Sequence, residues 1–452
     1  MLLDKKGYSY NDLTIVPSII SDVSSRSECN PFIENTKNFL PIFASPMASV
    51  VGVENLDKFL ENGIIPILPR NINFECHKSH LIDQTWVALS LKEFEYLFID
   101  NYSERIDDFR THYFVVVDIA NGHMKSLYEK CKKAKVLAKD NGYKLTIMTG
   151  NIANPETYKW ICENCYIEDN NGQYECCIDY IRVGIGGGCG CITTSNVSAH
   201  YPQASLINEC YQIKKKLSWE NSYKSNPYNC YSKYNNLPKI VADGGIRNYD
   251  HVIKALALGA DYVMIGSVFS QCIESAGEKS NKNINQKISL RFPIERYKDF
   301  SVDGKGIWSA YYTDKFIEEN SKTWKNKIDE WKKHIEEGLF TKDDADYKLA
   351  ILQYQDKIKE LKEKRILGSI DVKFFGMASA GGQKSIDGEK KKTAEGITKY
   401  LPVKYTLSGW VENMISYLRS AMSYTNCNNL NDFIGKPELI VNSISEIQAV
   451  NK

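Results

Sequence analysis

Short runs of apolar, β-branched or aromatic residues recur along the chain. Eight such runs lie at 41–46, 64–69, 86–91, 113–118, 144–149, 179–184, 238–243 and 261–266. Because they are almost continuously apolar rather than alternating, they predict strands of a parallel sheet that is buried on both faces. Helical periodicity is present between most of them, at 55–61, 124–139, 155–162, 203–217 and 251–258.

Strands that alternate with helices in this way predict an α/β fold, a (β/α)8 TIM barrel, because eight units close such a barrel. An open, doubly wound sheet permits the same alternation and stays the alternative. In a barrel the active site lies at the carboxyl ends of the strands. The residues that directly follow each apolar run are therefore the candidate functional residues.

The pattern changes beyond the last predicted strand. Apolar residues there recur every three or four positions, at 324, 328, 331 and 335 and again at 351, 354, 358 and 361, which predicts two amphipathic helices. A break at Gly338 and a cap at Thr341, with Asp344 three residues later, predict that they form an antiparallel hairpin. We interpret it as a lid or packing arm, and a partner-binding coiled coil is the alternative.

The expected domains follow from these elements. They are the main part of the barrel at 1–300, an inserted charged helical hairpin at 301–370, and a C-terminal flap and barrel-completing segment at 371–452. A stretch rich in Tyr, Asn and Ser at 218–237 has no periodicity and is predicted to be a long surface loop.

Charge and composition narrow the class of protein. With 57 Lys and Arg against 56 Asp and Glu, the formal net charge is +1, so neither nucleic acid nor an anionic membrane is an expected partner. The N-terminus lacks a signal-peptide core, and no stretch approaches the roughly 18 apolar residues of a membrane span. The 13 cysteines are scattered, which is typical of a reducing compartment, and a cytoplasmic location is expected.

Four cysteines lie close together in a polar insertion before the sixth predicted strand, at Cys162, Cys165, Cys176 and Cys177. Four thiolates suit zinc, but two adjacent cysteines seldom bind the same ion. We therefore interpret them as scattered thiols, and a zinc site stays the alternative.

The glycine-rich segment VGIGGGCGCITT, residues 183–194, directly follows the sixth predicted strand. Its glycines allow the backbone to approach an anion or a cation closely. Cys191 ends the loop, where backbone amides favour a thiolate, and Thr193 and Thr194 follow with hydroxyls that can pass protons. This predicts a nucleophilic cysteine in a glycine cradle, and a glycine-rich turn with an inert thiol is the alternative.

Two more glycine-containing loops follow the next two strands. They are Asp243-Gly244-Gly245 after the seventh strand and Gly266-Ser267 after the eighth. In phosphate-binding barrels the corresponding loops supply backbone amides to the phosphate. Asp243 can also accept hydrogen bonds from sugar hydroxyls. A phosphate together with a ribose predicts a nucleotide substrate.

Taken together, these motifs resemble the IMP dehydrogenase/GMP reductase family. The resemblance rests on VGIGGGCGCITT, VADGGIR, VMIGS, DIANGH, GNIANPE and SRSEC, and it covers most of residues 7–275 and resumes at 374–446. It implies that Cys191 attacks C2 of a purine and forms a covalent thioimidate. It also implies that a nicotinamide cofactor exchanges hydride with the same carbon.

Within the family the chain is most similar to the bacterial-type GMP reductases. No paired regulatory domain follows the second strand, and no Arg-Tyr pair follows FFGMASAGG. The resemblance thus implies NADPH-dependent reductive deamination of GMP to IMP and ammonia, a reaction of purine interconversion and salvage. Two alternatives stay open: an IMP dehydrogenase that oxidises IMP to XMP with NAD, and a catalytically silent barrel that binds a purine nucleotide.

The resemblance also implies roles for individual residues. Cys191 is the nucleophile, and Thr193 with Glu395 protonates the departing ammonia. The implied nucleotide-binding residues are Asp243, Gly244, Gly245, Gly266, Ser267, Gly376, Met377 and Gly396. The implied cofactor-binding residues are Ser25, Arg26, Asp118, Ile119, Ala120, Lys391 and Lys392. A monovalent cation such as K⁺ is implied at Gly186, Gly188, Cys191 and Thr194. A homotetramer is implied as well.

Four sites depart from the family pattern, one of which is Gly187-Gly188-Cys189, a variation of the more familiar glycine-serine loop. The chain has Met47-Ala48-Ser49 where relatives often have Met-Asp-Thr, so a carboxylate is missing there. Arg70 stands where many reductases carry a lysine, and a guanidinium does not readily donate a proton, so we expect it to position charge. Phe374 occupies the place of a phosphate-contacting tyrosine in some relatives.

Overall fold

The computed structural model describes most of the chain and divides it into two compact units. The described residues are 5–72, 76–77, 79–80, 85–100, 112–168, 174–188, 193–224, 236–282, 289–291, 294–377, 379–387 and 396–443. The first unit comprises 1–277, 374–399 and 407–452, and the second comprises 278–373 and 400–406.

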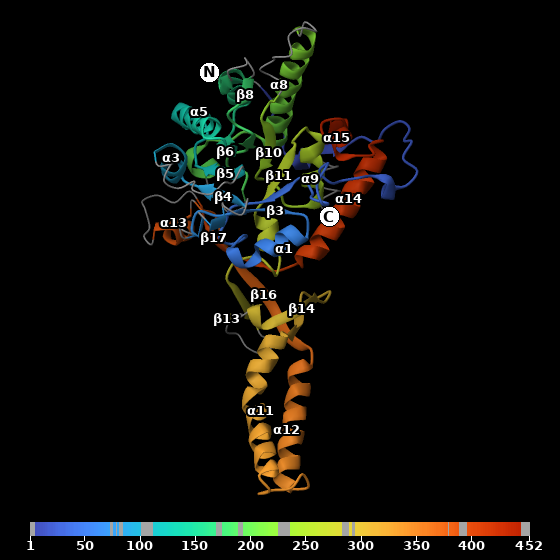
Figure 1. Cartoon of the computed structure of the whole chain (residues 1–452). Coiled ribbons are helices and arrows are strands. Elements are labelled where there is room, and N and C mark those ends of the chain that lie inside the picture. Colours follow the sequence, from blue (N-terminus) through green and yellow to red (C-terminus); the bar gives the residue numbers. More distant parts are fainter. Residues whose placement is uncertain are drawn as a thin grey trace. The chain divides into compact units, whose positions relative to one another are not determined.

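A closed barrel of eight parallel strands forms the centre of the first unit (Figure 1). Its strands are β2 (Ile42–Ala44), β3 (Ile65–Leu68), β4 (Trp86–Leu89), β5 (His112–Asp118), β6 (Lys144–Ile152), β9 (Tyr180–Val183), β10 (Lys239–Asp243) and β11 (Tyr262–Ile265). They pair in the order β10-β11-β2-β3-β4-β5-β6-β9, and β9 closes the ring by pairing with β10. The predicted TIM barrel and its eight strands are confirmed, and β6 extends further than predicted, to Ile152.

The interior of the barrel is filled by large apolar side chains from successive strands. Phe43, Trp86, Met148 and Tyr262 all belong to one buried cluster. The Phe43 and Trp86 rings meet edge to face at 5.4 Å between centroids. The barrel is therefore a packed core rather than a pore, which leaves the strand ends as the place for a site.

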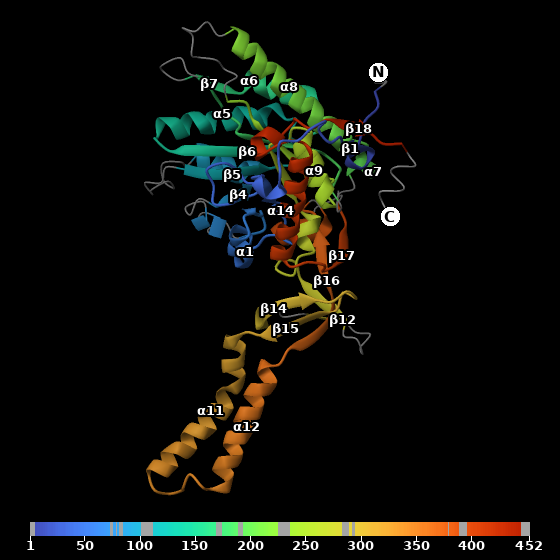
Figure 2. The ribbon, with the colours of Figure 1, turned by 90° about the vertical axis from the view of Figure 1, so that its right-hand side faces the viewer.

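Helices cover the barrel and confirm the predicted alternation. They are α1 (Leu56–Glu61), α3 (Leu91–Glu95), α5 (Lys125–Asp140), α6 (Pro155–Asn164), α7 (Thr193–Val197), α8 (Gln203–Lys224), α9 (Tyr249–Ala257), α10 (Ser267–Ser270), α13 (Ala380–Asp387), α14 (Leu407–Tyr424) and α15 (Leu430–Phe433). Helices α5 and α6 pack on β6 (Figure 2), and α8 packs on β10. Among the described residues no helix is long and apolar enough to cross a membrane.

The prediction of a surface loop at 218–237 is wrong for its first part. Helix α8 continues to Lys224, and residues 225–235 lie outside the described part of the chain. Serine, asparagine and tyrosine are only mildly unfavourable in a helix, and the first proline of this stretch is Pro227. Composition alone therefore does not end the helix at the predicted position.

Two small antiparallel pairs complete the first unit. Strand β1 (Leu13–Ile15) pairs with β18 (Leu439–Val441), which joins the N-terminal and C-terminal segments. Strands β7 (Tyr166–Glu168) and β8 (Tyr174–Cys176) form a hairpin before β9.

The second unit contains an antiparallel sheet and a helical hairpin. Its sheet runs β13 (Ser289–Arg291), β12 (Lys279–Lys282), β16 (Arg365–Phe375), β15 (Trp308–Tyr312) and β14 (Tyr297–Val302), and β17 (Thr398–Pro402) also pairs with β16. Helices α11 (Asp314–Glu336) and α12 (Ala345–Lys362) follow β15 and precede β16 in the chain, and they lie side by side (Figure 1). The helical hairpin predicted after the last barrel strand is thus confirmed.

The predicted cap at Thr341 is wrong, because the cap of α12 is Asp344. The Asp344 carboxylate accepts a hydrogen bond from the backbone N–H of Asp346 at 3.0 Å. An aspartate adjoining the first helical residue satisfies an N–H group that has no partner within the helix. Gly338 follows the end of α11 with φ of +76°, as the predicted break requires.

Candidate active site

A cavity of about 460 Å³ opens at the carboxyl ends of the barrel strands. Its wall includes Asp118 at the end of β5, Asp243 at the end of β10, and residues that follow β3, β9 and β11. This volume lies within the range of small-molecule sites. The cavity is therefore where a TIM barrel places its chemistry.

The structure brings the predicted nucleotide-binding residues together around this cavity. Loops after β10 and β11 and the segment after β16 contribute Asp243, Gly244, Gly245, Gly266, Ser267, Gly376, Met377 and Gly396 to its wall. The Phe374 side chain, which departs from the family pattern, also lines the cavity and is buried.

The predicted cofactor residues fall into three groups. Asp118, Ile119 and Ala120 line the cavity. Ser25 and Arg26 do not: Ser25 caps a short 3-10 helix at Arg26–Glu28, and Arg26 Nη1 donates to the Ser420 hydroxyl at 3.4 Å. Lys391 and Lys392 lie outside the described residues.

Two of the three predicted catalytic residues, Cys191 and Glu395, also lie outside the described residues. Thr193 begins α7 and lines the cavity. Of the residues predicted for a cation, Gly186 and Gly188 line the cavity as well. The Thr194 hydroxyl donates to the Gly186 carbonyl oxygen at 3.2 Å, so these two residues lie together.

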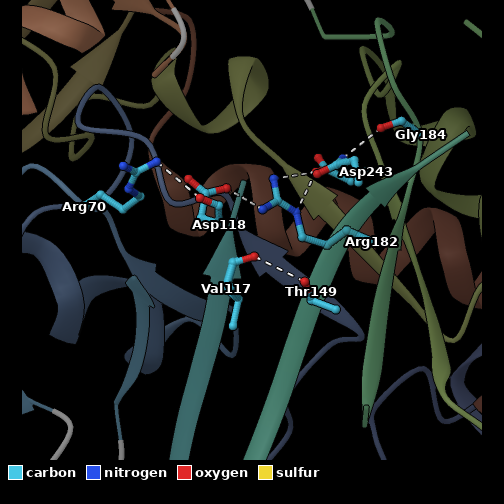
Figure 3. Close-up of polar contacts among 8 residues, drawn as sticks. Arg70, Val117, Asp118, Thr149, Arg182, Gly184 and Asp243 are labelled. Carbon is cyan, nitrogen blue, oxygen red and sulfur yellow. Dashed lines mark hydrogen bonds and ion pairs between the residues drawn. The ribbon is translucent and has the colours of Figure 1, made fainter. Parts of the chain in front are cut away.

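A row of alternating charges crosses the wall of the cavity, and we call Arg70, Asp118, Arg182 and Asp243 the charge row (Figure 3). Arg182 Nη1 lies 2.6 Å from Asp118 Oδ1. Arg182 Nη2 lies 2.9 Å from Asp243 Oδ2. At the other end, Arg70 Nη1 donates to the backbone oxygen of Asp118 at 3.2 Å. One guanidinium therefore joins two carboxylates that belong to different strands.

Burial and the two aspartates shift the pKa of Arg182 in opposite directions. Arg182 is 9% exposed. Its burial alone lowers the pKa of the guanidinium, but Asp243 and Asp118 reverse the effect and raise that pKa above its usual value. Arg182 is thus a permanent cation. Removing it would leave two carboxylates without a compensating charge.

Asp243 is held on one side and open on the other. Its Oδ2 accepts hydrogen bonds from Arg182 Nε at 2.9 Å and from Asn151 Nδ2 at 2.7 Å. Its Oδ1 accepts none from the described residues. A fixed carboxylate with one oxygen available on a cavity wall is suited to accept hydrogen bonds from the hydroxyls of a sugar.

The described part of the glycine-rich segment, residues 183–188, is held by its carbonyl groups. Five consecutive carbonyl oxygens each accept a hydrogen bond. The donors are Gln203 Nε2 to Val183 at 2.7 Å, Asn151 Nδ2 to Gly184 at 2.8 Å, His200 Nδ1 to Ile185 at 2.8 Å, the Thr194 hydroxyl to Gly186 at 3.2 Å, and the Gly245 N–H to Gly187 at 3.0 Å. The path that leads to Cys191 is therefore fixed by several separate segments.

Glycine is required at two positions of this path. Gly184 has φ of +134° and Gly186 has φ of +81°, a region that residues with a Cβ rarely adopt. A Cβ on Gly184 would lie 2.3 Å from the backbone oxygen of Asp243, and one on Gly186 would lie 1.9 Å from the Thr194 hydroxyl. The glycines allow the segment to approach its neighbours closely.

Sequence reasoning missed Arg182 and Asn151. Arg182 lies inside a run that was interpreted only as a buried strand, and Asn151 lies beyond the predicted end of β6. A charged residue in an otherwise apolar buried strand is itself a signal, because it needs a partner of opposite charge.

The four clustered cysteines are free and buried. Burial raises the pKa of the Cys162 and Cys165 thiols to about 12, so both are protonated near neutral pH. Within the described ranges, no three His, Cys, Asp or Glu side chains are placed to hold a metal ion together.

Comparisons with known proteins show which proteins the chain is similar to. Residues 99–291 match the family model of the IMP dehydrogenase / GMP reductase domain. The chain is similar to proteins named GMP reductase: it is 25% identical over 318 residues to one from Helicobacter pylori (strain G27) and 27% identical over 317 residues to one from Staphylococcus aureus (strain Newman). A third, from Pediococcus pentosaceus, is 26% identical over 319 residues. Each match covers 67% of this chain and 84% of the relative.

Proposed function

Residues 99–291 are an IMP dehydrogenase / GMP reductase domain, as the sequence motifs predict, and from this premise we propose that the protein is a GMP reductase. The reaction is GMP + NADPH + 2 H⁺ → IMP + NH₄⁺ + NADP⁺. The observation that carries the proposal is the cavity at the strand ends, whose wall contains all eight expected nucleotide residues and an open carboxylate oxygen on Asp243.

We assign the binding of GMP to the residues of this wall. The Asp243 carboxylate accepts hydrogen bonds from the ribose hydroxyls. The loops that contain Gly244, Gly245 and Gly266 present backbone amides to the phosphate. In this proposal C2 of the purine lies next to Cys191, which belongs to the part of the glycine-rich segment beyond the described residues 183–188.

Cys191 is the nucleophile in this proposal. Its thiolate adds to C2 of the purine, and loss of ammonia from the same carbon leaves a covalent thioimidate. Thr193, which lines the cavity, passes a proton from Glu395 to the leaving amine. A bound NADPH would supply hydride to the same carbon, and Cys191 would then leave as the thiolate with IMP as the product.

The residues present fit the two implied groups in part. Asp118, Ile119 and Ala120 line the cavity next to the charge row and would hold the reactive end of NADPH, while Lys391 and Lys392 would meet its 2′-phosphate. For a monovalent cation, Gly186 and Gly188 would offer carbonyl oxygens. The Gly186 carbonyl accepts one hydrogen bond and keeps a second lone pair. We also propose that the protein is a homotetramer and is located in the cytoplasm.

One assay tests the function. The purified full chain is incubated with GMP and NADPH, and separately with IMP and NAD⁺, and the absorbance of the reduced cofactor is followed. We expect oxidation of NADPH with release of one ammonia per turnover. Formation of NADH from IMP would instead identify an IMP dehydrogenase. No change in absorbance in either reaction, although GMP still binds, would indicate a nucleotide-binding barrel without catalysis.

A further inference from the structure

We propose that Arg182 is a positioning residue that couples binding of the nucleotide to binding of the cofactor. The inference rests on the proposed function, since it takes Asp243 as a nucleotide contact and Asp118 as a cofactor contact. It goes beyond that function because it makes the two ligands bind cooperatively through one side chain of the protein. Figure 3 shows Arg182 between the two carboxylates.

The guanidinium of Arg182 uses all three of its nitrogens in this arrangement. Nη1 lies 2.6 Å from Asp118 Oδ1, while Nε and Nη2 each lie 2.9 Å from Asp243 Oδ2. The planar group is rigid, so the position of one carboxylate is tied to that of the other. Neither carboxylate can turn without moving the shared cation.

Each carboxylate also keeps one oxygen for a ligand. Among the described residues no group donates to Asp118 Oδ2 or to Asp243 Oδ1, and both aspartates are on the cavity wall. The Arg182 side chain is 11% exposed, and those of Asp118 and Asp243 are 15% and 14% exposed. Each acid can therefore bind its own ligand through one carboxylate oxygen while the guanidinium holds the second oxygen of that acid.

Coupling follows from this sharing. A ligand that shifts one carboxylate also shifts the shared guanidinium and, through it, the second carboxylate, so each ligand changes the position in which the other meets its acid. Because the pairs are largely buried, their interaction is less screened than on an exposed surface. We expect positive coupling, and by linkage the effect of each ligand on the other is equal.

Arg70 does not replace Arg182 in this role. Arg70 donates to the backbone oxygen of Asp118 rather than to its carboxylate. Within the described part of the chain, Arg182 is the cation that contacts both acids.

The test measures coupling rather than activity. GMP is titrated calorimetrically into the full chain, with and without saturating NADP⁺, whose oxidised nicotinamide prevents turnover. For the unmodified protein we expect NADP⁺ to tighten GMP binding about 5- to 150-fold, the usual range of such couplings. In R182K, whose ammonium lacks the rigid planar fork that ties the two acids together, we expect the ratio of the two dissociation constants to approach one. A merely structural role would weaken GMP binding equally with and without NADP⁺.

Lys135 provides a matched control for loss of a buried bridging cation. Its side chain is 4% exposed and lies 3.0 Å from Asp179 and 3.5 Å from Glu175, outside the cavity wall. K135M should lower the melting temperature and leave the coupling ratio unchanged. D118N is a second variant that retains Arg182, and it should reduce the ratio even if R182K folds poorly.

The outcomes separate the inference from the function beneath it. An unchanged ratio in R182K and D118N overturns the role of Arg182. A ratio of one in the unmodified protein, with GMP bound, overturns the coupling but leaves the proposed function standing. Failure of the unmodified protein to bind GMP overturns both.

Discussion

The side-chain amide of Asn151 donates a hydrogen bond to the Asp243 carboxylate at 2.7 Å. The same nitrogen donates to the Gly184 carbonyl oxygen at 2.8 Å. One amide of β6 thus connects the predicted sugar-binding acid at the end of β10 to the start of the glycine-rich segment. The acid and the loop that leads to Cys191 are positioned together.

Replacing Asn151 should therefore weaken nucleotide binding. N151A removes a donor from Asp243, and we expect the dissociation constant for GMP to rise about tenfold, the equivalent of one hydrogen bond to a charged group. N151D should have a larger effect, because it places a second negative charge against Asp243. Titration calorimetry measures both. N154A is the matched control: Asn154 caps α6 through Glu156 N–H, so it should affect stability only. Equal affinity in N151D and N154A would contradict the prediction.

The two cysteines of the glycine-rich segment should differ sharply. We expect C191A to reduce the rate of NADPH oxidation by at least about 10³-fold, because loss of a covalent nucleophile removes the main reaction path. C189A is a control two residues away and should keep most of the activity. A covalent adduct with the purine, detected by mass spectrometry, should form in C189A and be absent in C191A. Activity that survives in C191A would show that the nucleophile lies elsewhere.

A methyl group at Gly184 should destabilise the barrel. Its Cβ would lie 2.3 Å from the backbone oxygen of Asp243, at φ of +134°, so a steric clash adds to the conformational cost. We expect G184A to lower the free energy of unfolding by at least about 3 kcal/mol and to abolish GMP binding. Gly142 has φ of +73° with nothing within 4 Å of its Cβ position, so G142A should cost only about 1 kcal/mol. Urea unfolding compares them, and similar losses in the two variants would count against the clash.

Stability should fall in mild acid because of His77. This residue is fully buried, its Nε2 donates to the Pro69 carbonyl oxygen at 2.8 Å, and its Nδ1 has no partner among the described residues. Burial lowers the pKa of His77 below 6.5, so the unfolded chain binds the proton more readily than the folded one. The stabilisation is complete above pH 6.5 and is lost as the pH falls through that value toward the lower folded pKa.

Urea unfolding between pH 8 and pH 5 tests this sign, with about 1.4 kcal/mol per pH unit as the limit for one proton. In H77Q the amide can still donate to Pro69 but does not titrate. The variant should therefore lose less stability in acid than the unmodified protein. Parallel curves for the two proteins would exclude His77 as the source.

The barrel could be predicted from sequence because its strands are short and apolar on both faces. That pattern locates the eight barrel strands closely, whichever residues pair across the ring. The site was predictable only where glycines or a strand-end acid mark it, as at Asp243. Arg182 could not be assigned a role in this way, since its two partners are 64 and 61 residues away and are brought to it by the barrel closure. Its contacts depend on register, which apolar periodicity does not specify.

The five restrained carbonyls from Val183 to Gly187 have an evolutionary consequence. Their donors come from β6, from α7, from α8, from the stretch between those two helices and from the loop after β10. Substitutions among contacting residues are not additive, so a change at one donor alters what is tolerated at the others. These positions should therefore change together among divergent relatives. A chimera that receives only the loop of another enzyme should have that loop's sequence but not its conformation.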